Sequence, residues 1–168
     1  ETVDLDKLNP RKVQDMSQMF CLMSWRVKNM TTQYTYNEKI TSLDLSSWDM
    51  ADVRYLQKMF YGCKALKEVN TTGWDLSKSR DMTEMFALSG LETLDAGHWK
   101  LNPSLALDLG GMFRDCANLK YVNTSGWNTE RVVDLAYMFS GCENLQTVDV
   151  SGWNLKNVKS ISGMFLNC

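Results

Sequence analysis

The sequence predicts an α/β repeat solenoid, a right-handed coil with one parallel sheet along one face and short helices on the opposite face. Three observations support this prediction. A Met-Phe pair recurs six times, with steps of 26 or 27 residues after a first step of 40. A tryptophan follows the same period in five of these copies. Each copy also changes from strand-like to helix-like spacing of its apolar residues, and a period of this length is typical of stacked supersecondary units.

The Met-Phe pairs define six units and one insertion within a single domain. The pairs are Met19-Phe20, Met59-Phe60, Met85-Phe86, Met112-Phe113, Met138-Phe139 and Met164-Phe165. The units cover about residues 1–21, 40–65, 66–90, 91–118, 119–144 and 145–168. The longer first step places an insertion at about 22–39. Because one unit cannot bury its apolar face alone, we expect the stacked units to share one continuous core.

The unit at 40–65 shows how each element is predicted. Leu43 and Leu45 alternate with polar residues, which predicts a short strand with both leucines facing inward. The small and Asx residues around Trp48 then favour a turn. The apolar residues that follow have the spacing of one helical face, and they are Val53, Leu56, Met59, Phe60 and Cys63. Parallel strands joined by such crossovers are right-handed in nearly all cases, which sets the predicted hand.

Composition and charge exclude several classes of partner. The 168 residues carry a formal net charge of −2, which gives no electrostatic reason to expect nucleic acid. No apolar run is long enough for a transmembrane helix, so we expect no membrane insertion by this segment. No signal peptide is recognisable, and neither end carries a polar capping unit. We therefore expect a piece of a longer array, or an array that other chains cap.

Catalysis finds no support in the sequence, and we predict that the chain is not an enzyme. His98 is the single histidine, and no glycine-rich phosphate loop, nucleophile elbow or metal motif is present. No Cys-x-x-Cys spacing exists, which argues against a zinc site. We therefore expect no cofactor and no bound metal.

Four of the five cysteines form a repeat column. They lie three residues after the phenylalanine of a Met-Phe pair, at Cys63, Cys116, Cys142 and Cys168. Ser89 takes this place in the third unit, and Cys21 lies outside the column. Because free cysteine packs as a small apolar residue, we predict buried, reduced thiols that stack in the core. Disulfides between neighbouring units are the alternative.

The tryptophans of the repeat allow two interpretations. Exposed indoles about 4.8 Å apart would form a stacking platform for a glycan. Alternatively, each ring closes one end of the core at a corner, where burial of a large apolar side chain contributes about 1.5–3 kcal/mol. We favour the packing interpretation for this column, which contains Trp48, Trp74, Trp99, Trp127 and Trp153.

A column of Asp and Asn residues lies on the outward face of the predicted strands. Its members are Asp4, Asp44, Asn70, Asp95, Asn123 and Asp149. Stacked carboxylates repel one another, and the alternation of Asp with Asn from Asp44 onward softens this repulsion. In one interpretation these side chains bind cations or sugar hydroxyls. In the other, which we favour, they hydrogen-bond to the backbone of the following turn.

The insertion at 22–39 supplies the residues that a protein interface needs. Long loops in compact folds are usually functional or disordered, and Trp, Tyr and Arg are the commonest interface anchors. The alternative is a loop that only shields one end of the core. The predicted binding surface combines the insertion with the outward strand columns, and its residues are Trp25, Arg26, Tyr34, Tyr36, Asp44, Asn70, Asp95, Tyr121, Asn123 and Asp149.

Two long runs follow one pattern: LDLSSWDMADVRYLQKMFYGC at 43–63 and VDVSGWNLKNVKSISGMFLNC at 148–168. They resemble the 26-residue repeat of the BspA-like surface proteins, a group that includes mycoplasma lipoprotein-associated repeats. The resemblance covers the whole chain except the insertion. It implies a leucine-rich-repeat-like fold and a surface-exposed adhesion or protein-interaction module, located at the cell surface or outside the cell.

The resemblance implies no common ligand, because a repeat fold does not determine function. The expected partner is a protein or glycan on another cell or matrix, and further copies of the chain or adjoining repeats are also candidates. Two alternatives to adhesion remain open. One is a structural repeat protein that assembles end to end into a filament or sheath, and the other is a carbohydrate-binding solenoid.

Overall fold

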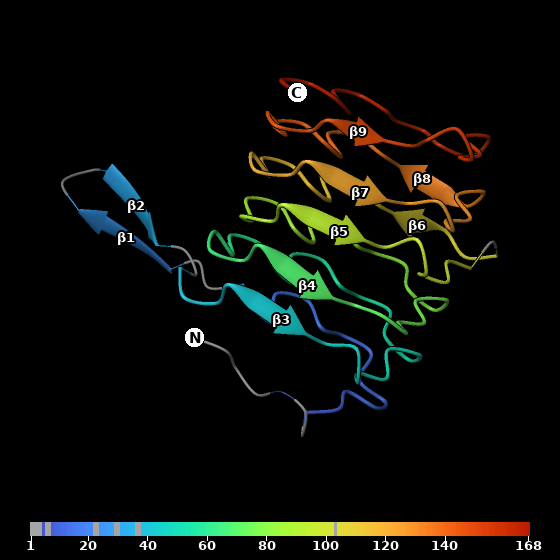
Figure 1. The fold of residues 1–168 in the computed structure, drawn as a ribbon, viewed down its shortest axis with the longest axis horizontal. Coiled ribbons are helices and arrows are strands. Elements are labelled where there is room, and N and C mark those ends of the chain that lie inside the picture. The colour runs from blue at the N-terminus through green and yellow to red at the C-terminus, as the bar shows by residue number, and fades with distance from the viewer. Residues whose placement is uncertain (1–4, 6–7, 22–23, 29–30, 36–37, 103) are drawn as a thin grey trace.

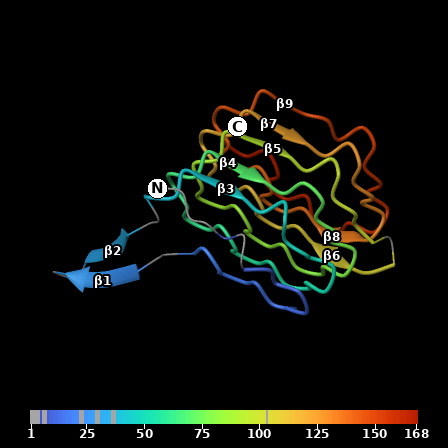
Figure 2. The ribbon, with the colours of Figure 1, turned by 60° about the horizontal axis from the view of Figure 1, so that its bottom comes forward.

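The computed structural model describes residues 5, 8–21, 24–28, 31–35, 38–102 and 104–168. Its body is a coil of stacked turns, one for each repeat, with the first repeat at one end and the last repeat at the other (Figure 1). A hairpin projects from the side of this coil in both views (Figures 1 and 2). In the hairpin, β1 (Ser24–Lys28) pairs with β2 (Thr31–Thr35) in antiparallel orientation.

One face of the coil is a ladder of short strands from five successive repeats (Figure 1). The strands are β3 (Ser42–Asp44), β4 (Glu68–Asn70), β5 (Thr93–Asp95), β7 (Tyr121–Asn123) and β9 (Thr147–Val148). Pairing is parallel, with Leu43 opposite Val69 and Leu94 opposite Val122. These four middle residues are buried. Strand alternation therefore directs one apolar residue per repeat inward and leaves its neighbours on the outer face.

A second parallel ladder runs along another face of the coil. It contains β6 (Leu107–Asp108) and β8 (Val132–Asp134), which pair in parallel. Isolated parallel bridges extend this ladder toward both ends of the coil through Asp15, Tyr55, Asp81 and Ser160. Each of the last five repeats therefore contributes extended backbone at two places, and not at one place as the sequence pattern suggests.

The prediction of an α/β solenoid with short helices opposite the sheet is wrong, because the described residues contain strands, bridges and turns but no helix. One cause of the absence of helices is a column of residues with positive φ, each directly before a Met-Phe pair. Its members are Gln18 (φ 60), Lys58 (φ 58), Glu84 (φ 53), Gly111 (φ 59), Tyr137 (φ 56) and Gly163 (φ 60). A right-handed helix cannot continue through a left-handed residue, so each repeat turns at this point.

The backbone hydrogen bonds give a second reason for the absence of helices. In the second repeat, the N–H groups of Leu56, Lys58 and Phe60 donate to carbonyl oxygens of the third repeat, at 2.9, 3.0 and 2.8 Å. A helix would direct these donors to carbonyls four residues earlier in the same segment. Because the donors bond between turns of the coil, no described segment forms a helix able to span a membrane.

The apolar columns stack into one continuous core. The phenylalanine rings of the Met-Phe pairs form a stack along the coil, with neighbouring centroids 4.9–5.5 Å apart. A second stack, with spacings of 5.8–6.1 Å, contains Trp74, Trp99, Trp127 and Trp153. The prediction that the indoles pack in the core is confirmed for the four buried rings, which are Trp48, Trp74, Trp99 and Trp127.

The prediction of buried, unbridged thiols is confirmed for Cys63, Cys116 and Cys142. Each Sγ donates to the backbone carbonyl of a phenylalanine one repeat earlier, at 3.0–3.3 Å. Ser89 continues the column, with its Oγ 3.4 Å from the Sγ of Cys116. Burial raises the pKa of the Cys63 thiol to about 12 and that of Cys116 to about 11. Cys168, at the end of the column, is exposed.

Candidate binding surface

The outer face of the first ladder is polar and regular. Its outward positions are Ser42, Asp44, Glu68, Asn70, Thr93, Asp95, Tyr121, Asn123, Thr147 and Asp149, and all except Ser42 and Asn123 are classed as exposed. Tyr121, with 44% of its surface exposed, is the single aromatic residue among these ten. This face therefore offers many hydrogen-bonding groups and little apolar area.

The Asp and Asn column on this face holds the turns that follow the strands. The Oδ1 atom of each residue accepts the backbone N–H two residues further on, at 2.9–3.2 Å, in Asp44, Asn70, Asp95, Asn123 and Asp149. Hydrogen bonds from Ser46 and Ser151 lower the pKa of Asp44 and Asp149 below the ordinary range of a carboxyl group. The geometry thus supports the structural interpretation of this column, in which Asx side chains cap turns.

The column also relieves its own charge repulsion. Asn123 donates from Nδ2 to Oδ1 of Asp95 at 2.8 Å. A neutral amide therefore lies next to the carboxylate of the preceding repeat, where a second carboxylate would repel it. Close by, Glu92 is paired with Lys67 at 3.7 Å and with Lys120 at 3.0 Å. The described residues contain no group of three His, Cys, Asp or Glu side chains placed to hold a metal ion. The side chains on this face are arranged for polar contacts.

The hairpin places the other predicted anchors far from the Asp and Asn column. Trp25 lies opposite Tyr34, and Arg26 lies opposite Gln33, in the register of β1 and β2. Tyr36 falls outside the described residues. Among the strands of the structure, β1 and β2 contact only each other. The hairpin projects outward and does not lie over the first strands of the ladder (Figures 1 and 2), so the predicted residues form two separate groups.

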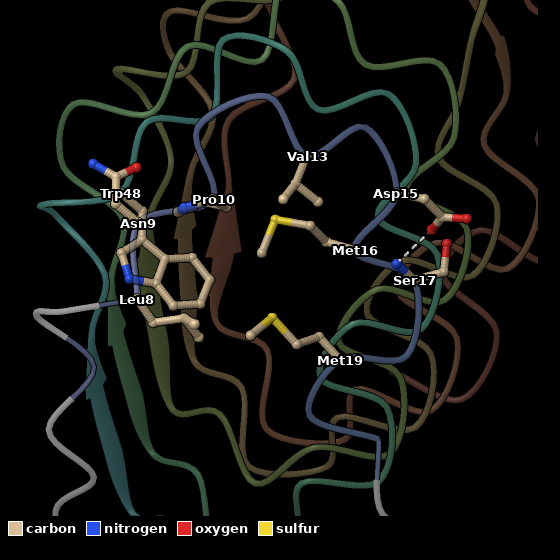
Figure 3. Close-up of a pocket in the computed structure, with 9 residues that line it drawn as sticks. All are labelled: Leu8, Asn9, Pro10, Val13, Asp15, Met16, Ser17, Met19 and Trp48. Atoms are coloured by element: carbon tan, nitrogen blue, oxygen red, sulfur yellow. Dashed lines mark hydrogen bonds between the residues drawn. The ribbon is translucent and has the colours of Figure 1, made fainter.

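Sequence reasoning missed a cavity at the N-terminal end of the coil. It has a volume of about 350 Å³ and is lined by Leu8, Asn9, Pro10, Val13, Asp15, Met16, Ser17, Met19 and Trp48. Figure 3 shows Val13, Met16, Met19 and Trp48 arranged around it. The first repeat carries Leu8 where the others carry tryptophan, and this substitution is the signal that could have located the cavity.

A second hollow, of about 230 Å³, lies on the bridge ladder, where Gly110 and Gly111 leave space between neighbouring repeats. Asp108 and Asp134 line it. Burial raises the pKa of Asp108, and the nearby charges of Asp134 and Asp81 add to this effect. The Gly110-Gly111 pair gives little warning of such a hollow in the sequence, because glycine is also common at turn positions.

The comparisons with known proteins show the family of the chain and do not indicate a ligand. The family described as "Mycoplasma protein of unknown function, DUF285" matches residues 1–99 and 89–168. The chain belongs to this family. The two matches to DUF285 together cover all 168 residues and overlap at residues 89–99. Neither the search of curated proteins nor the search of solved structures found a match.

Proposed function

We propose that this DUF285 chain is a surface-exposed module that binds a partner protein and carries out no catalysis. The BspA-like character of the two runs at 43–63 and 148–168 supports the adhesion class and a location at the cell surface. The partner is a protein on another cell or in the surrounding matrix.

The observation that carries this proposal is the hairpin formed by β1 and β2. It interrupts a regular repeat, projects from the coil and pairs with no other described strand. An isolated two-stranded hairpin is marginally stable at best, and an open strand edge is a template for pairing with another chain. Trp25 and Tyr34 hold opposite positions in the register of this hairpin, and both residue types are common among interface anchors.

The polar ladder face is the second part of the proposed surface. It lacks large anchors apart from Tyr121, so its own contacts would be weak and would gain strength mainly through many copies on one surface. The carbohydrate-binding alternative has less support, because four of the five indoles of the tryptophan column are buried and cannot stack on a sugar.

Two variants test the surface. One replaces residues 22–39 by a short Gly-Ser linker, and the other is Tyr121→Ser, which leaves the Asx turns of the ladder intact. Tyr137→Ser is the matched control, because Tyr137 is also 44% exposed but lies in the turn before a Met-Phe pair. Binding to whole cells or to immobilised matrix proteins should fall most for the linker variant and less for Tyr121→Ser. Full binding by both variants would refute the proposed surface.

A further inference from the structure

The bridge ladder carries a run of three carboxylates in the middle of the coil. Asp108 is in parallel register with Asp81 on one side and with Asp134 on the other. Tyr55 and Ser160 continue the ladder beyond them, so Asp108 is the one described residue of this ladder with a carboxylate neighbour on both sides. Neighbouring strands lie about 4.8 Å apart, and like charges directly opposite each other repel. Asp81, Asp108 and Asp134 form the aspartate triad.

Other aspartates that cap turns of the coil avoid such repulsion. On the first ladder, Asp95 is paired with Asn123, whose amide donates to it at 2.8 Å. At another corner of the coil, Asp49 and Asp75 occupy the same position in successive repeats. Each of these two carboxylates has a basic partner, at 3.5 and 3.8 Å. Amide neighbours and ion pairs are therefore the two means by which the coil relieves stacked carboxylates.

The aspartate triad has neither of these means. Among the described residues, no ion pair joins a Lys or Arg to any of its three carboxylates. Arg114 lines the hollow beside the triad, but it pairs with Glu84 at 2.5 Å and with Asp115 at 3.6 Å. Thr83 and Tyr137, which also line this hollow, carry no charge at neutral pH.

The backbone around Asp108 supplies no compensating cation either. Arg80 and Arg131, on the two flanking repeats, bond to the strand of Asp108 through their backbone carbonyls. These carbonyls accept the N–H groups of Asp108 and Leu107, both at 3.1 Å. The repeats on both sides are therefore held to this strand by hydrogen bonds, while the charges of the triad oppose the same contact.

The hollow concentrates this repulsion at Asp108. A Cβ built at Gly110 would lie 3.1 Å from Oδ1 of Asp108 and 3.9 Å from Cγ of Asp134, so both carboxyl groups border the space over this glycine. Burial raises the pKa of Asp108, and the charges of Asp134 and Asp81 add to the effect, although the hydrogen bond from Gly110 acts against it. The ionised form of Asp108 is therefore the unfavourable one in the folded coil.

We propose that the aspartate triad is an acid-sensitive contact built into the coil. While all three carboxylates are ionised, their repulsion weakens the contact that joins the third, fourth and fifth repeats. A proton on Asp108 removes the central charge and supplies an O–H donor, so the same contact tightens on acidification. This inference concerns the cohesion of the coil and does not rest on the proposed partner-binding surface, because the hairpin forms a separate sheet (Figure 1).

The direction of the shift at Asp108 determines the pH window. An aspartate has an ordinary pKa of 3.8, and the folded coil raises this pKa for Asp108. Its contribution to stability is therefore fully present below pH 3.8 and is lost as the pH rises through the raised pKa. Asp44 and Asp149 act in the opposite sense, because their pKa values are lowered. A comparison of matched variants is therefore needed to isolate the triad.

Two Asp→Asn variants of the full chain provide this comparison. Asp108→Asn removes the central charge and keeps an acceptor for the N–H of Gly110, and Asp95→Asn makes the same change in a turn closed by Gly97. In urea at neutral pH, Asp108→Asn should have a higher unfolding midpoint than the native chain, and this difference should vanish below pH 3.8. Asp95→Asn should give no gain, because the amide of Asn123 loses a charged acceptor.

A third variant, with Asp81→Asn and Asp134→Asn together, tests whether the flanking charges cause the effect. In this background, Asp108→Asn should no longer raise the midpoint, and NMR titration should give a lower pKa for Asp108 than in the native chain.

Amide hydrogen exchange tests the native chain without a substitution. The N–H of Leu109 donates across the bridge ladder to Asp134, and the N–H of Ala96 donates across the first ladder to Asn123, both at 3.1 Å. As the pH falls from neutral toward 3.8, the protection of Leu109, corrected for intrinsic exchange, should rise about 2- to 5-fold relative to Ala96.

Several outcomes would overturn the proposal. They are a folded Asp108→Asn variant that is no more stable than the native chain at neutral pH, an equal gain from Asp95→Asn, and a gain that persists below pH 3.8. An equal response of Leu109 and Ala96 in the native chain overturns it even where a variant does not fold. The variant without residues 22–39 should keep the same pH dependence, which separates this result from the test of partner binding.

Discussion

The central and the terminal repeats are built from the same columns of residues, but only the central repeats bury them completely. Phe113 lies between two rings and is fully buried, whereas Phe165, two repeats later in the same column, is 46% exposed. The sequence of a repeat therefore specifies which side chains point inward. The neighbouring repeats determine how much of the surface of those side chains is buried. The same ring therefore contributes less to stability where only one neighbouring ring packs on it.

Truncation of the central ring should have the largest effect. We expect Phe113→Ala to lower the free energy of unfolding by about 3–5 kcal/mol, because it removes two stacking contacts and leaves a cavity. Phe165→Ala should cost about 1 kcal/mol or less, since a partly exposed site leaves little cavity. Urea unfolding followed by circular dichroism measures both. Equal losses would mean that the end repeat is as tightly packed as the centre.

The thiol column should make stability fall in alkaline solution. The pKa of Cys116 is raised from 9.0 to about 11 by burial, so the folded state holds this proton after the unfolded state has lost it. Stability from this group is fully present below pH 9 and declines by about 1.4 kcal/mol per pH unit between pH 9 and 11. Cys116→Ala should flatten this part of the profile, although it lowers stability at neutral pH.

Cys168, the exposed residue of the thiol column, is the matched control for Cys116. Cys168→Ala should change the alkaline profile little, because this thiol lies at the surface. In the native protein at neutral pH, Cys168 should react with a thiol reagent faster than Cys63, Cys116 and Cys142, which should react only after unfolding. Rapid labelling of Cys116 would contradict the buried column.

Two glycines at the same corner of successive repeats offer a backbone comparison. A Cβ added at Gly126 would lie 1.9 Å from the carbonyl oxygen of Gly97, whereas a Cβ at Gly152 would meet nothing within 4 Å. We expect Gly126→Ala to destabilise the fold by about 1–3 kcal/mol through this clash. Gly152→Ala should change stability by no more than about 0.5 kcal/mol. Thermal unfolding of the two variants side by side distinguishes them.

The smallest expected difference concerns the indole hydrogen bonds. Trp127 donates from Nε1 to the carbonyl of Ala96 at 2.8 Å, whereas Nε1 of Trp48 is buried and has no partner among the described residues. Trp127→Phe should therefore lower stability by about 1 kcal/mol more than Trp48→Phe, because it alone breaks a bond and leaves a buried acceptor. The two midpoints in urea test this prediction. If Trp48→Phe is the more damaging change, then Trp48 has a hydrogen-bond acceptor outside the described residues.

The sequence by itself determined the repeats, the inward columns and the chemistry of the turns. Leu43, Trp74 and Cys116 are buried as their positions predict, because residues that recur with the period must pack on their equivalents in the next repeat. The sequence also predicts the Asx turns at Asp44 and Asp149, because a short carboxylate side chain readily accepts a hydrogen bond from the backbone two residues further on. These features depend on residue type and spacing alone.

Only the tertiary structure decided that the segment from Val53 to Cys63 is not a helix. Its apolar spacing fits a helical face, but Lys58 adopts a left-handed conformation and the N–H groups bond to the next repeat. The left-handed state is rare for residues with a side chain, so no single-residue preference predicts it at Lys58 or Tyr137. Neighbouring repeats supply the hydrogen bonds that stabilise it, and the sequence of one repeat read alone does not show them.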